Sequence, residues 1–204
     1  MGRVGVLPLF DPSSEDVAQK PGVVTIMVIP ASLNYDTPSP DQFFLEAVCD
    51  HLRPRRLVTT ELYVRGPEYV DIWVSVVIEV LGGYGAGPVR EAVRQELSKF
   101  LSPLYGGHNG KGWLLNVPVQ QLELEAVVAR VEGVRLVPRL ELGARTDNAS
   151  NIPMEGLMLP RLRGVAVTEG DFIPLSQLRN APVVTGGPLD GPRWTPIPVF
   201  PQRC

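Results

Sequence analysis

The chain has 204 residues, a formal net charge of −3 and 44% hydrophobic residues, which is ordinary for a folded protein. No extended basic run favours nucleic acid as a partner, and no apolar run is long enough for a membrane span. The N-terminus lacks the pattern of a signal peptide. The chain also contains 21 prolines and 20 glycines, which predict long irregular stretches.

Two strands and a helix are expected in the first third of the chain. Residues 3–10 resemble a short strand, and Val23–Ile29 is a continuous apolar run, typical of a strand buried on both faces. A helix should follow, with Ser39 as N-cap, Pro40 as first helical residue and Gln42 as capping-box partner. Its expected inner face consists of Phe44, Leu45, Val48 and Leu52.

The strongest strand signal lies at residues 70–80, where every even position is Val or Ile. Such alternation indicates a strand with one buried face. The turn-like residues 65–68 precede it and predict a hairpin with residues 57–64. Glycine-rich residues 82–87 follow, and Pro88 should begin a helix. The expected inner face of that helix consists of Val89, Val93, Leu97, Phe100 and Leu101.

Residues 102–118 should form a glycine-rich loop before another helix that begins at Pro118. Residues 134–142 alternate as a strand, in which Pro138 predicts an edge position or a bulge. Gly133 should end the preceding helix. Two stripes could be the buried face of that helix: Leu122, Ala126, Ala129 and Val131, or Leu124, Val128 and Val131.

These elements predict an α+β fold over residues 1–142, with a mostly antiparallel sheet and helices packed on one face, similar to a split βαβ arrangement. Residues 143–204 are rich in proline and glycine and contain only short β-like pieces at 164–168 and 183–185. We expect them to form an extended arm, laid either over the chain's own domain or over a neighbour.

Two glycine segments are similar to phosphate-binding loops, but both are incomplete. Residues 82–87 lead to Pro88 where a third glycine would be needed. Residues 106–112 lack the spacing of a P-loop and end in Gly112, where Ser or Thr would hold magnesium. We therefore expect no nucleotide cofactor. The alternative is a small-molecule-binding or enzymatic α+β domain that uses both loops.

Metal and nucleophile chemistry have few candidate residues. The chain has two cysteines and two histidines, and Cys49 and His51 point to different faces of the predicted helix. We expect no metal site and no catalytic residue. Cys49 and Cys204 are predicted to be unpaired thiols of a reducing compartment.

Apolar residues near the C-terminus are candidates for partner contact. Trp194, Ile197, Val199 and Phe200 lie in an extended, proline-spaced strip suited to a partner's groove or sheet edge. The strip could instead fold back on its own domain. Trp113 and Tyr105, in the second glycine loop, are further candidate contact residues.

Several segments together resemble a known family. They include Pro-Gly-Val-Val-Thr-Ile-Met-Val-Ile-Pro at 21–30, Leu-x-Pro-Arg-Arg at 52–56, Arg-Gly-Pro-x-Tyr-Val at 65–70 and Leu-Ser-Pro-Leu-Tyr-Gly-Gly at 101–107. Their order and spacing over residues 3–142 resemble the C-terminal part of baseplate J-like proteins. These proteins are wedge components of contractile phage tails and of related extracellular injection systems.

The resemblance implies a non-enzymatic structural subunit of a baseplate ring around the tail hub. Its partners would be other wedge subunits, the hub and sheath-proximal proteins in a sixfold assembly. The resemblance also implies cytoplasmic assembly into a phage tail or tail-like particle. Family members are usually longer, with further domains on the N-terminal side, so this chain is expected to be a short member or a fragment.

Overall fold

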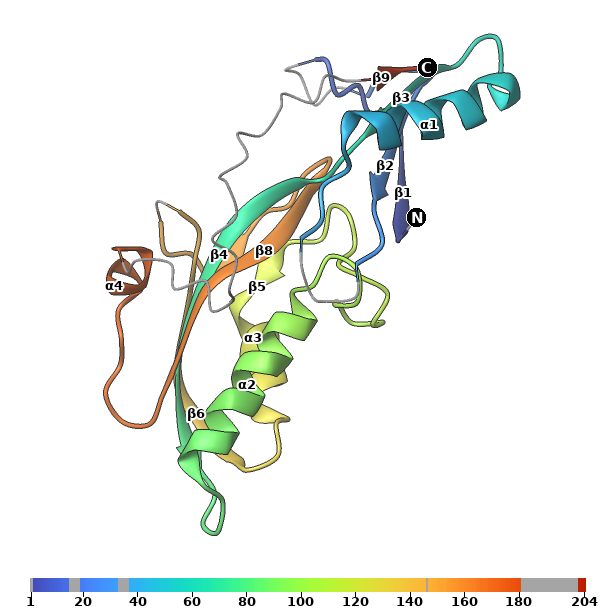
Figure 1. Cartoon of the computed structure of the whole chain (residues 1–204). Helices are drawn as coiled ribbons and strands as arrows, with labels where there is room; N and C mark the ends of the chain where they lie inside the picture. Colours follow the sequence, from blue (N-terminus) through green and yellow to red (C-terminus); the bar gives the residue numbers. More distant parts are fainter. Residues whose placement is uncertain (1, 15–18, 33–36, 146, 181–201) are drawn as a thin grey trace.

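The computed structural model describes residues 2–14, 19–32, 37–145, 147–180 and 202–204 (Figure 1). It confirms the α+β class, with helices and strands interspersed along the chain. The elements are β1 (Arg3–Pro8), β2 (Val23–Ile29), α1 (Gln42–Leu52), η1 (Arg53–Arg55), β3 (Glu61–Arg65), β4 (Glu68–Val80), α2 (Ala86–Phe100), β5 (Val119–Gln120), α3 (Gln121–Ala129), β6 (Val134–Gly143), β7 (Asn151–Ile152), β8 (Met158–Thr168), α4 (Leu175–Asn180) and β9 (Gln202–Arg203).

The expected single sheet is instead divided: within the described residues, the strands form three sheets. The first has the order β1-β2-β3-β9, in which β2 and β3 are parallel and the other pairs are antiparallel. This sheet and α1 form the upper lobe in Figure 1. Helix α1 connects the two parallel strands, as a parallel pair requires a long crossover.

The second sheet has the order β6-β4-β8 and forms the lower lobe with α2, α3 and α4. Strand β4 is antiparallel to β6 and parallel to β8. Helices α2 and α3 lie on one side of this sheet and α4 on the other (Figure 1). The polar face of β4 is therefore covered as well, and the Ser75 hydroxyl donates a hydrogen bond of 2.5 Å to the Ile173 carbonyl before α4. The third sheet pairs β5 with β7.

The predicted hairpin at residues 57–80 is wrong. Strands β3 and β4 follow one another through Gly66 and Pro67, but they belong to different sheets. Both edges of each strand are already occupied, by β2 and β9 around β3 and by β6 and β8 around β4. The chain consequently passes from the upper lobe into the lower one instead of folding back (Figure 1).

Helix α1 begins later than predicted. Its N-cap is Asp41, whose carboxylate accepts a hydrogen bond of 2.8 Å from the Phe44 backbone N–H. Ser39 and Pro40 thus precede the cap, and Gln42 is the first helical residue. The shift follows from the presence of a second good capping residue next to the helix, since Asp and Ser cap about equally well.

The inner faces of the helices agree with the hydrophobic pattern. Val89, Val93 and Leu97 of α2 are buried, as predicted. In α3, the second of the two possible stripes faces the core: Leu124 and Val128 are fully buried, whereas Leu122 is 74% exposed. Val131, the last residue of the predicted stripe, lies beyond the end of α3 at Ala129.

Pro138 has the predicted effect on its strand. Strand β6 is at the edge of its sheet, and its register with β4 shifts between the pairs Val77–Arg139 and Glu79–Leu136. The irregularity lies opposite Ile78, where β6 contributes Pro138 and its neighbour. A proline lacks the N–H that the ladder needs, so the strand bulges there.

Part of the predicted arm belongs to the chain's own sheet. Residues 164–168 are the end of the eleven-residue strand β8, which lies parallel to β4. The short helix α4 was not predicted. Residues 151–180 therefore match the alternative of an arm laid over its own domain, while residues 183–185 lie outside the described residues. The division of the chain at residue 142 stays a prediction.

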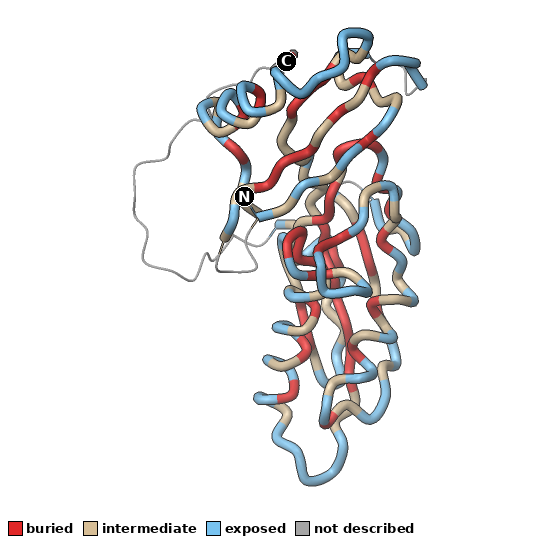
Figure 2. Tube along the Cα trace, turned by 90° about the vertical axis from the view of Figure 1, so that its right-hand side faces the viewer, coloured by how far each residue is buried: buried red, intermediate tan, exposed pale blue. Residues whose placement is uncertain are grey.

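The main core crosses from one lobe to the other. One cluster of buried side chains includes Leu7 and Ile29 of the upper sheet together with Val74 and Val93 of the lower lobe. A smaller cluster fills the space between the upper sheet and α1. Figure 2 shows buried positions along both lobes and exposed turns at the two ends.

Candidate partner-contact site

The Arg-Gly-Pro-x-Tyr segment forms the joint between the two lobes. The Arg65 guanidinium donates a hydrogen bond of 3.0 Å to the Pro12 carbonyl, and the Tyr69 hydroxyl donates one of 2.8 Å to the Pro38 carbonyl. A Cβ atom on Gly66 would lie 2.8 Å from the ring of Pro40, so the chain needs glycine there. These contacts attach the joint to two loops and hold the crossing between the sheets.

Burial shifts the pKa values of two side chains at the joint. It raises the pKa of Tyr69 and lowers the pKa of Arg65. The Tyr69 side chain therefore remains a neutral phenol that can donate a hydrogen bond to the Pro38 carbonyl. Arg161 of β8 pairs with Asp71 at 2.5 Å, and its guanidinium lies 5.8 Å from the centre of the Tyr69 ring.

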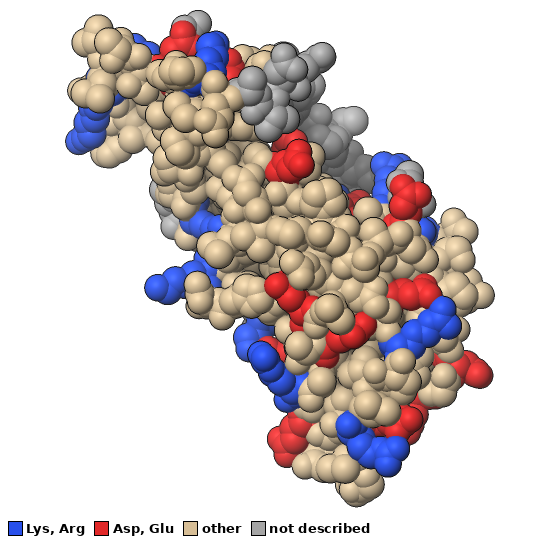
Figure 3. Space-filling view, turned by 180° about the vertical axis from the view of Figure 1, so that it is seen from behind, with Lys and Arg blue, Asp and Glu red and all other residues tan. Residues whose placement is uncertain are grey.

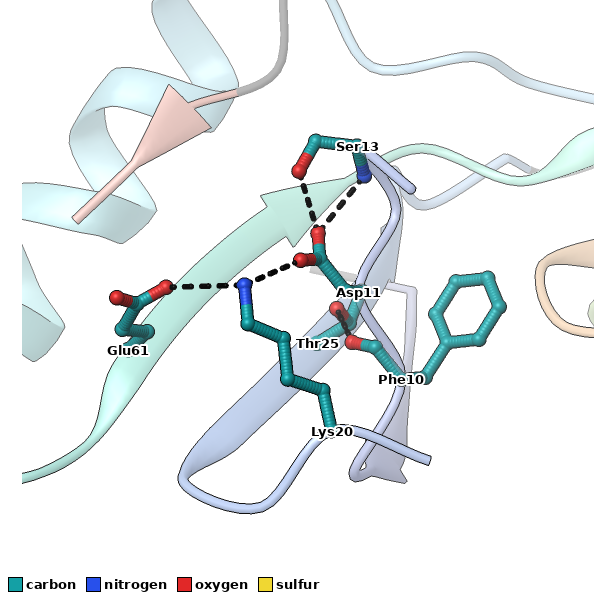
Figure 4. A network of polar contacts seen from close by, with 6 residues as sticks. All are labelled: Phe10, Asp11, Ser13, Lys20, Thr25 and Glu61. Carbon is teal, nitrogen blue, oxygen red and sulfur yellow. Dashed lines mark hydrogen bonds and ion pairs between the residues drawn. The ribbon is translucent and has the colours of Figure 1, made fainter. Parts of the chain in front are cut away.

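A second polar network closes the turn after β1 (Figure 4). The Asp11 carboxylate accepts hydrogen bonds from the Ser13 N–H at 2.9 Å, the Ser13 hydroxyl at 2.5 Å and the Lys20 ammonium at 2.8 Å. The bond from Lys20 is the main reason why the pKa of Asp11 falls to about 2, and it raises the pKa of Lys20. Lys20 also lies 4.0 Å from Glu61 at the start of β3. The network holds Ser13 and Lys20 against Asp11 and therefore has a structural role.

The glycine segment 106–112 is closed by its own hydrogen bonds. The N–H groups of Gly106, Gly107 and Gly112 donate to the carbonyls of Ser102, Phe100 and Gly106, at 3.0, 2.8 and 2.9 Å. In a phosphate-binding loop such N–H groups point at the ligand instead. These N–H groups are therefore not free to bind a phosphate in this conformation.

A groove of about 640 Å³ lies between α2, α3 and this glycine segment. Its lining mixes charges of both signs with apolar side chains: Glu96, Lys99, Arg130, Glu132, Phe100 and Val131. His108, also in the lining, lies 3.3 Å from Glu123. Within the described part of the chain, no group of three or more His, Cys, Asp or Glu residues could hold a metal ion.

The structure places Trp113 and Tyr105 in different environments. Trp113 is 1% exposed; its indole N–H donates to the Val117 carbonyl at 2.8 Å, and its ring meets Phe100 edge-on. Its side chain thus anchors the loop inside the molecule. Tyr105 is 41% exposed, and its hydroxyl donates to the Ser32 carbonyl. Trp194, Ile197, Val199 and Phe200 lie outside the described residues.

The prediction of two unpaired thiols is wrong, because Cys49 and Cys204 form a disulfide. Their Cα atoms lie 5.5 Å apart although 155 positions separate them in the sequence. Cys49 lies on the inner face of α1, and Cys204 follows the edge strand β9. Only the tertiary fold brings the two together, so their spacing offers no signal.

An exposed tip at the end of the upper lobe was not predicted from the sequence. We use "the tip" for residues 53–58, which contain η1 and the turn before β3. Leu57 is 73% exposed and Val58 is 98% exposed. Arg53, Arg55 and Arg56 are exposed as well, and Arg55 donates to the His51 carbonyl at 2.6 Å. Exposed apolar side chains next to arginines make the tip a candidate protein contact.

On the face that Figure 3 shows, the charged side chains do not form a patch of one sign. Acidic and basic side chains are interspersed there over both lobes. None of the helices in the described residues is long and apolar enough to cross a membrane.

No protein family and no curated protein matches the chain in sequence. Among solved structures, one that matches is titled "Cryo-EM structure of the anti-feeding prophage (AFP) baseplate, 6-fold symmetrised". The TM-score is 0.48 and the sequence identity is 15%. The match covers 72% of this chain and 29% of the other, so this chain spans less than a third of the matched chain's length.

Proposed function

We propose that this chain is a non-enzymatic structural subunit of the baseplate of a contractile tail or contractile injection system. One observation carries the proposal. The Arg-Gly-Pro-x-Tyr-Val segment, part of the resemblance to baseplate J-like proteins, forms the joint between the lobes through Arg65 and Tyr69. The segment that carries the resemblance thus has a structural role within this chain.

The tip supplies a candidate contact surface for that role. The Leu-x-Pro-Arg-Arg segment, also part of the resemblance, leads directly into the exposed Leu57 and Val58. A side chain exposed as fully as Val58 contributes little to the folding of its own chain. We propose that the tip packs against another wedge subunit, and that the partners include the hub and sheath-proximal proteins of a sixfold ring.

The C-terminal region would add a second contact. We propose that residues 1–142 form the part related to baseplate J-like proteins and that residues 143–204 form an arm, whose first part, with β8 and α4, lies over the chain's own domain. Trp194, Ile197, Val199 and Phe200 would be the anchor of that arm on a neighbouring subunit. Assembly would take place in the cytoplasm, before the chain becomes part of a tail or tail-like particle.

Variants of the tip test this function in particles. Val58→Asp should leave the thermal midpoint of the isolated chain within about 1 °C of the wild type, because Val58 is exposed. It should reduce incorporation of the tagged chain into purified particles at least tenfold, because it places a charge in an apolar contact. Arg94→Asp, on the exposed face of α2 in the other lobe, is the control and should assemble normally.

Electron microscopy of the native particle gives the direct test. Density for this chain in a ring at the base of the tail, with the tip against a neighbour, is the expected result. Normal incorporation of Val58→Asp would exclude the tip as a contact. Absence of the chain from baseplates would reject the structural function itself.

The groove beside the glycine segment suits a second candidate function, the binding of a small molecule. Its volume would admit a small ligand, and Lys99 and Arg130 in its lining could attract an anionic group. Titration calorimetry with ATP and NAD, together with elemental analysis, separates the two functions. The structural function predicts no saturable binding and no bound metal. Stoichiometric micromolar binding would favour the ligand-binding alternative.

A further inference from the structure

The last three residues of the chain are held entirely by the upper lobe. Strand β9 pairs antiparallel with β3, through the pairs Tyr63–Arg203 and Val64–Gln202. The Cys204 backbone N–H continues the ladder and donates a hydrogen bond of 2.9 Å to the Leu62 carbonyl. The disulfide to Cys49 then attaches the end of the chain to α1. Backbone pairing and a covalent bond thus act on the same short strand.

The remainder of the upper lobe forms a preshaped receptor for this strand. The Cys204 side chain is only 9% exposed and lies in the apolar cluster of Val28, Leu45, Leu62 and Val64. Cys49 is 2% exposed, on the inner face of α1 between those side chains. The outer edge of β3 supplies the backbone groups. We call the β3 edge, Cys49 and this apolar cluster the acceptor.

The chain reaches the acceptor over a long connection. The preceding described element, α4, lies on the lower lobe, far from β9 (Figure 1). Residues 181–201 separate the two elements in the sequence. Docking of the strand on its own acceptor is an intramolecular step, whereas docking on a second copy is bimolecular. The share of strands that dock on a second copy therefore rises with protein concentration.

We propose that the acceptor also takes the C-terminal strand of a second copy of this chain, and that the Cys49–Cys204 disulfide can form between two copies. The occupant is a second copy because the acceptor fits this chain's own C-terminus in its strand direction, apolar cluster and thiol. The added strand pairs along a sheet edge, a common mode of peptide recognition. The covalent bond then fixes the exchange. This inference does not depend on the baseplate function.

The chemistry of the exchange is ordinary thiol–disulfide exchange. A thiolate, from Cys49 of one copy, attacks glutathione disulfide and releases one glutathione. The Cys204 thiolate of the other copy then attacks the mixed disulfide and releases the second glutathione. Two protein thiols are oxidised to the disulfide, their two protons pass to the released glutathione thiolates, and one glutathione disulfide is reduced to two glutathione molecules.

The test uses the whole wild-type chain in two isotopic forms. Equal amounts of ¹⁵N-labelled and unlabelled protein are reduced, mixed at about 1 mM and reoxidised with glutathione disulfide, and the peptides linked through Cys49 and Cys204 are identified by mass spectrometry. We expect mixed heavy–light linkages at about a tenth to a half of the total, because a high protein concentration favours docking between copies. Reoxidation at about 10 μM should lower the mixed fraction at least about tenfold, because docking between copies is bimolecular.

Each outcome decides between exchange and a purely internal bond. Only heavy–heavy and light–light linkages at the high concentration would overturn the proposal. The absence of any linkage between Cys49 and Cys204 would show that the acceptor does not bind the C-terminal strand.

Single-cysteine variants give a second test that excludes the internal bond. Cys49→Ala retains the strand thiol, and Cys204→Ala retains the acceptor thiol. When both are mixed in a glutathione buffer, the heterodimer should exceed the combined homodimers more than tenfold on a non-reducing gel. Gln202→Pro, made in the Cys49→Ala chain, removes a backbone N–H from β9 opposite Val64 and should abolish that excess. A heterodimer no more abundant than random pairing allows, or one unaffected by Gln202→Pro, would overturn the proposal.

Discussion

At the residue scale, Val93 gives the clearest test of the core. Its side chain is fully buried in the same cluster as Val74 and Val76, whereas Arg94 beside it is exposed. Val93→Asp would bury a charge with no partner among those apolar groups and should lower the free energy of unfolding by at least about 3 kcal/mol. Arg94→Asp should change it by less than about 1 kcal/mol. Urea denaturation measures both, and equal effects would mean that α2 faces the core differently.

The Asp11 network should make stability depend on pH in acid. The pKa of Asp11 is lowered from 3.8 to about 2 in the folded chain, chiefly by the bond from Lys20. Between these values the unfolded chain binds more protons, so the contribution is present above pH 3.8 and is lost as the pH falls through about 2. Asp11→Asn should remove that part of the slope of stability against pH. Thermal unfolding from pH 5 to 2 measures it.

Two further substitutions rank the causes of the lowered pKa. Lys20→Met removes the strongest donor and should flatten the pH dependence more than Ser13→Ala, which removes a weaker one. The reverse order would contradict the assignment of Lys20 as the main cause. An unchanged slope in Asp11→Asn would show that this carboxylate does not couple to folding.

At the element scale, α3 tests which stripe of an apolar helix carries the packing. Leu124 is fully buried and Leu122 is 74% exposed, although the two lie on the same helix. Leu124→Ala should cost about 2–5 kcal/mol, because it leaves a cavity beside Val128. Leu122→Ala should lie within about 0.5 kcal/mol of the wild type. Chemical denaturation of both variants settles the helix orientation, and a larger effect at Leu122 would reverse it.

Local patterns in the sequence predicted elements well and pairings poorly. The strand Val23–Ile29 and the inner face of α2 follow from periodicity, because each pattern is set by neighbours three or four positions away at most. The hairpin failed because β3 and β4 have partners from distant parts of the chain. Sequence turn signals at Gly66 and Pro67 cannot reveal such partners.

The C-terminal third shows the same limit at its strongest. Strand β8 has weak alternation and contains Pro160 and Gly164, yet it lies along ten positions of β4. Strand β8 is stabilised by its pairing with β4. The disulfide likewise depends on two distant elements, α1 and β9. The tip was overlooked for the opposite reason, since exposure of Val58 is a property of the folded lobe.

At the scale of the whole molecule, two truncations separate the fold from the end of the chain. Strand β8 pairs with β4 over most of its length and contributes buried side chains, among them Leu159 and Val167. Deletion of residues 143–204 would expose the edge of β4 and the core beneath it. The shortened chain should therefore show no cooperative thermal transition, because the lost apolar burial is comparable with the whole stability of a domain.

Deletion of residues 181–204 leaves β8 and α4 in place and removes β9 with the disulfide. Closing a loop of 155 positions by a disulfide is worth about 2–4 kcal/mol, so this chain should still unfold cooperatively, with a midpoint about 5–15 °C lower. Cys204→Ala in the full-length chain is the matched control and should reproduce most of that decrease. Calorimetry of the three chains distinguishes the contributions of β8 and the disulfide. A cooperative transition in the chain that ends at residue 142 would show that the first 142 residues fold without β8, because β4 would then tolerate an open edge.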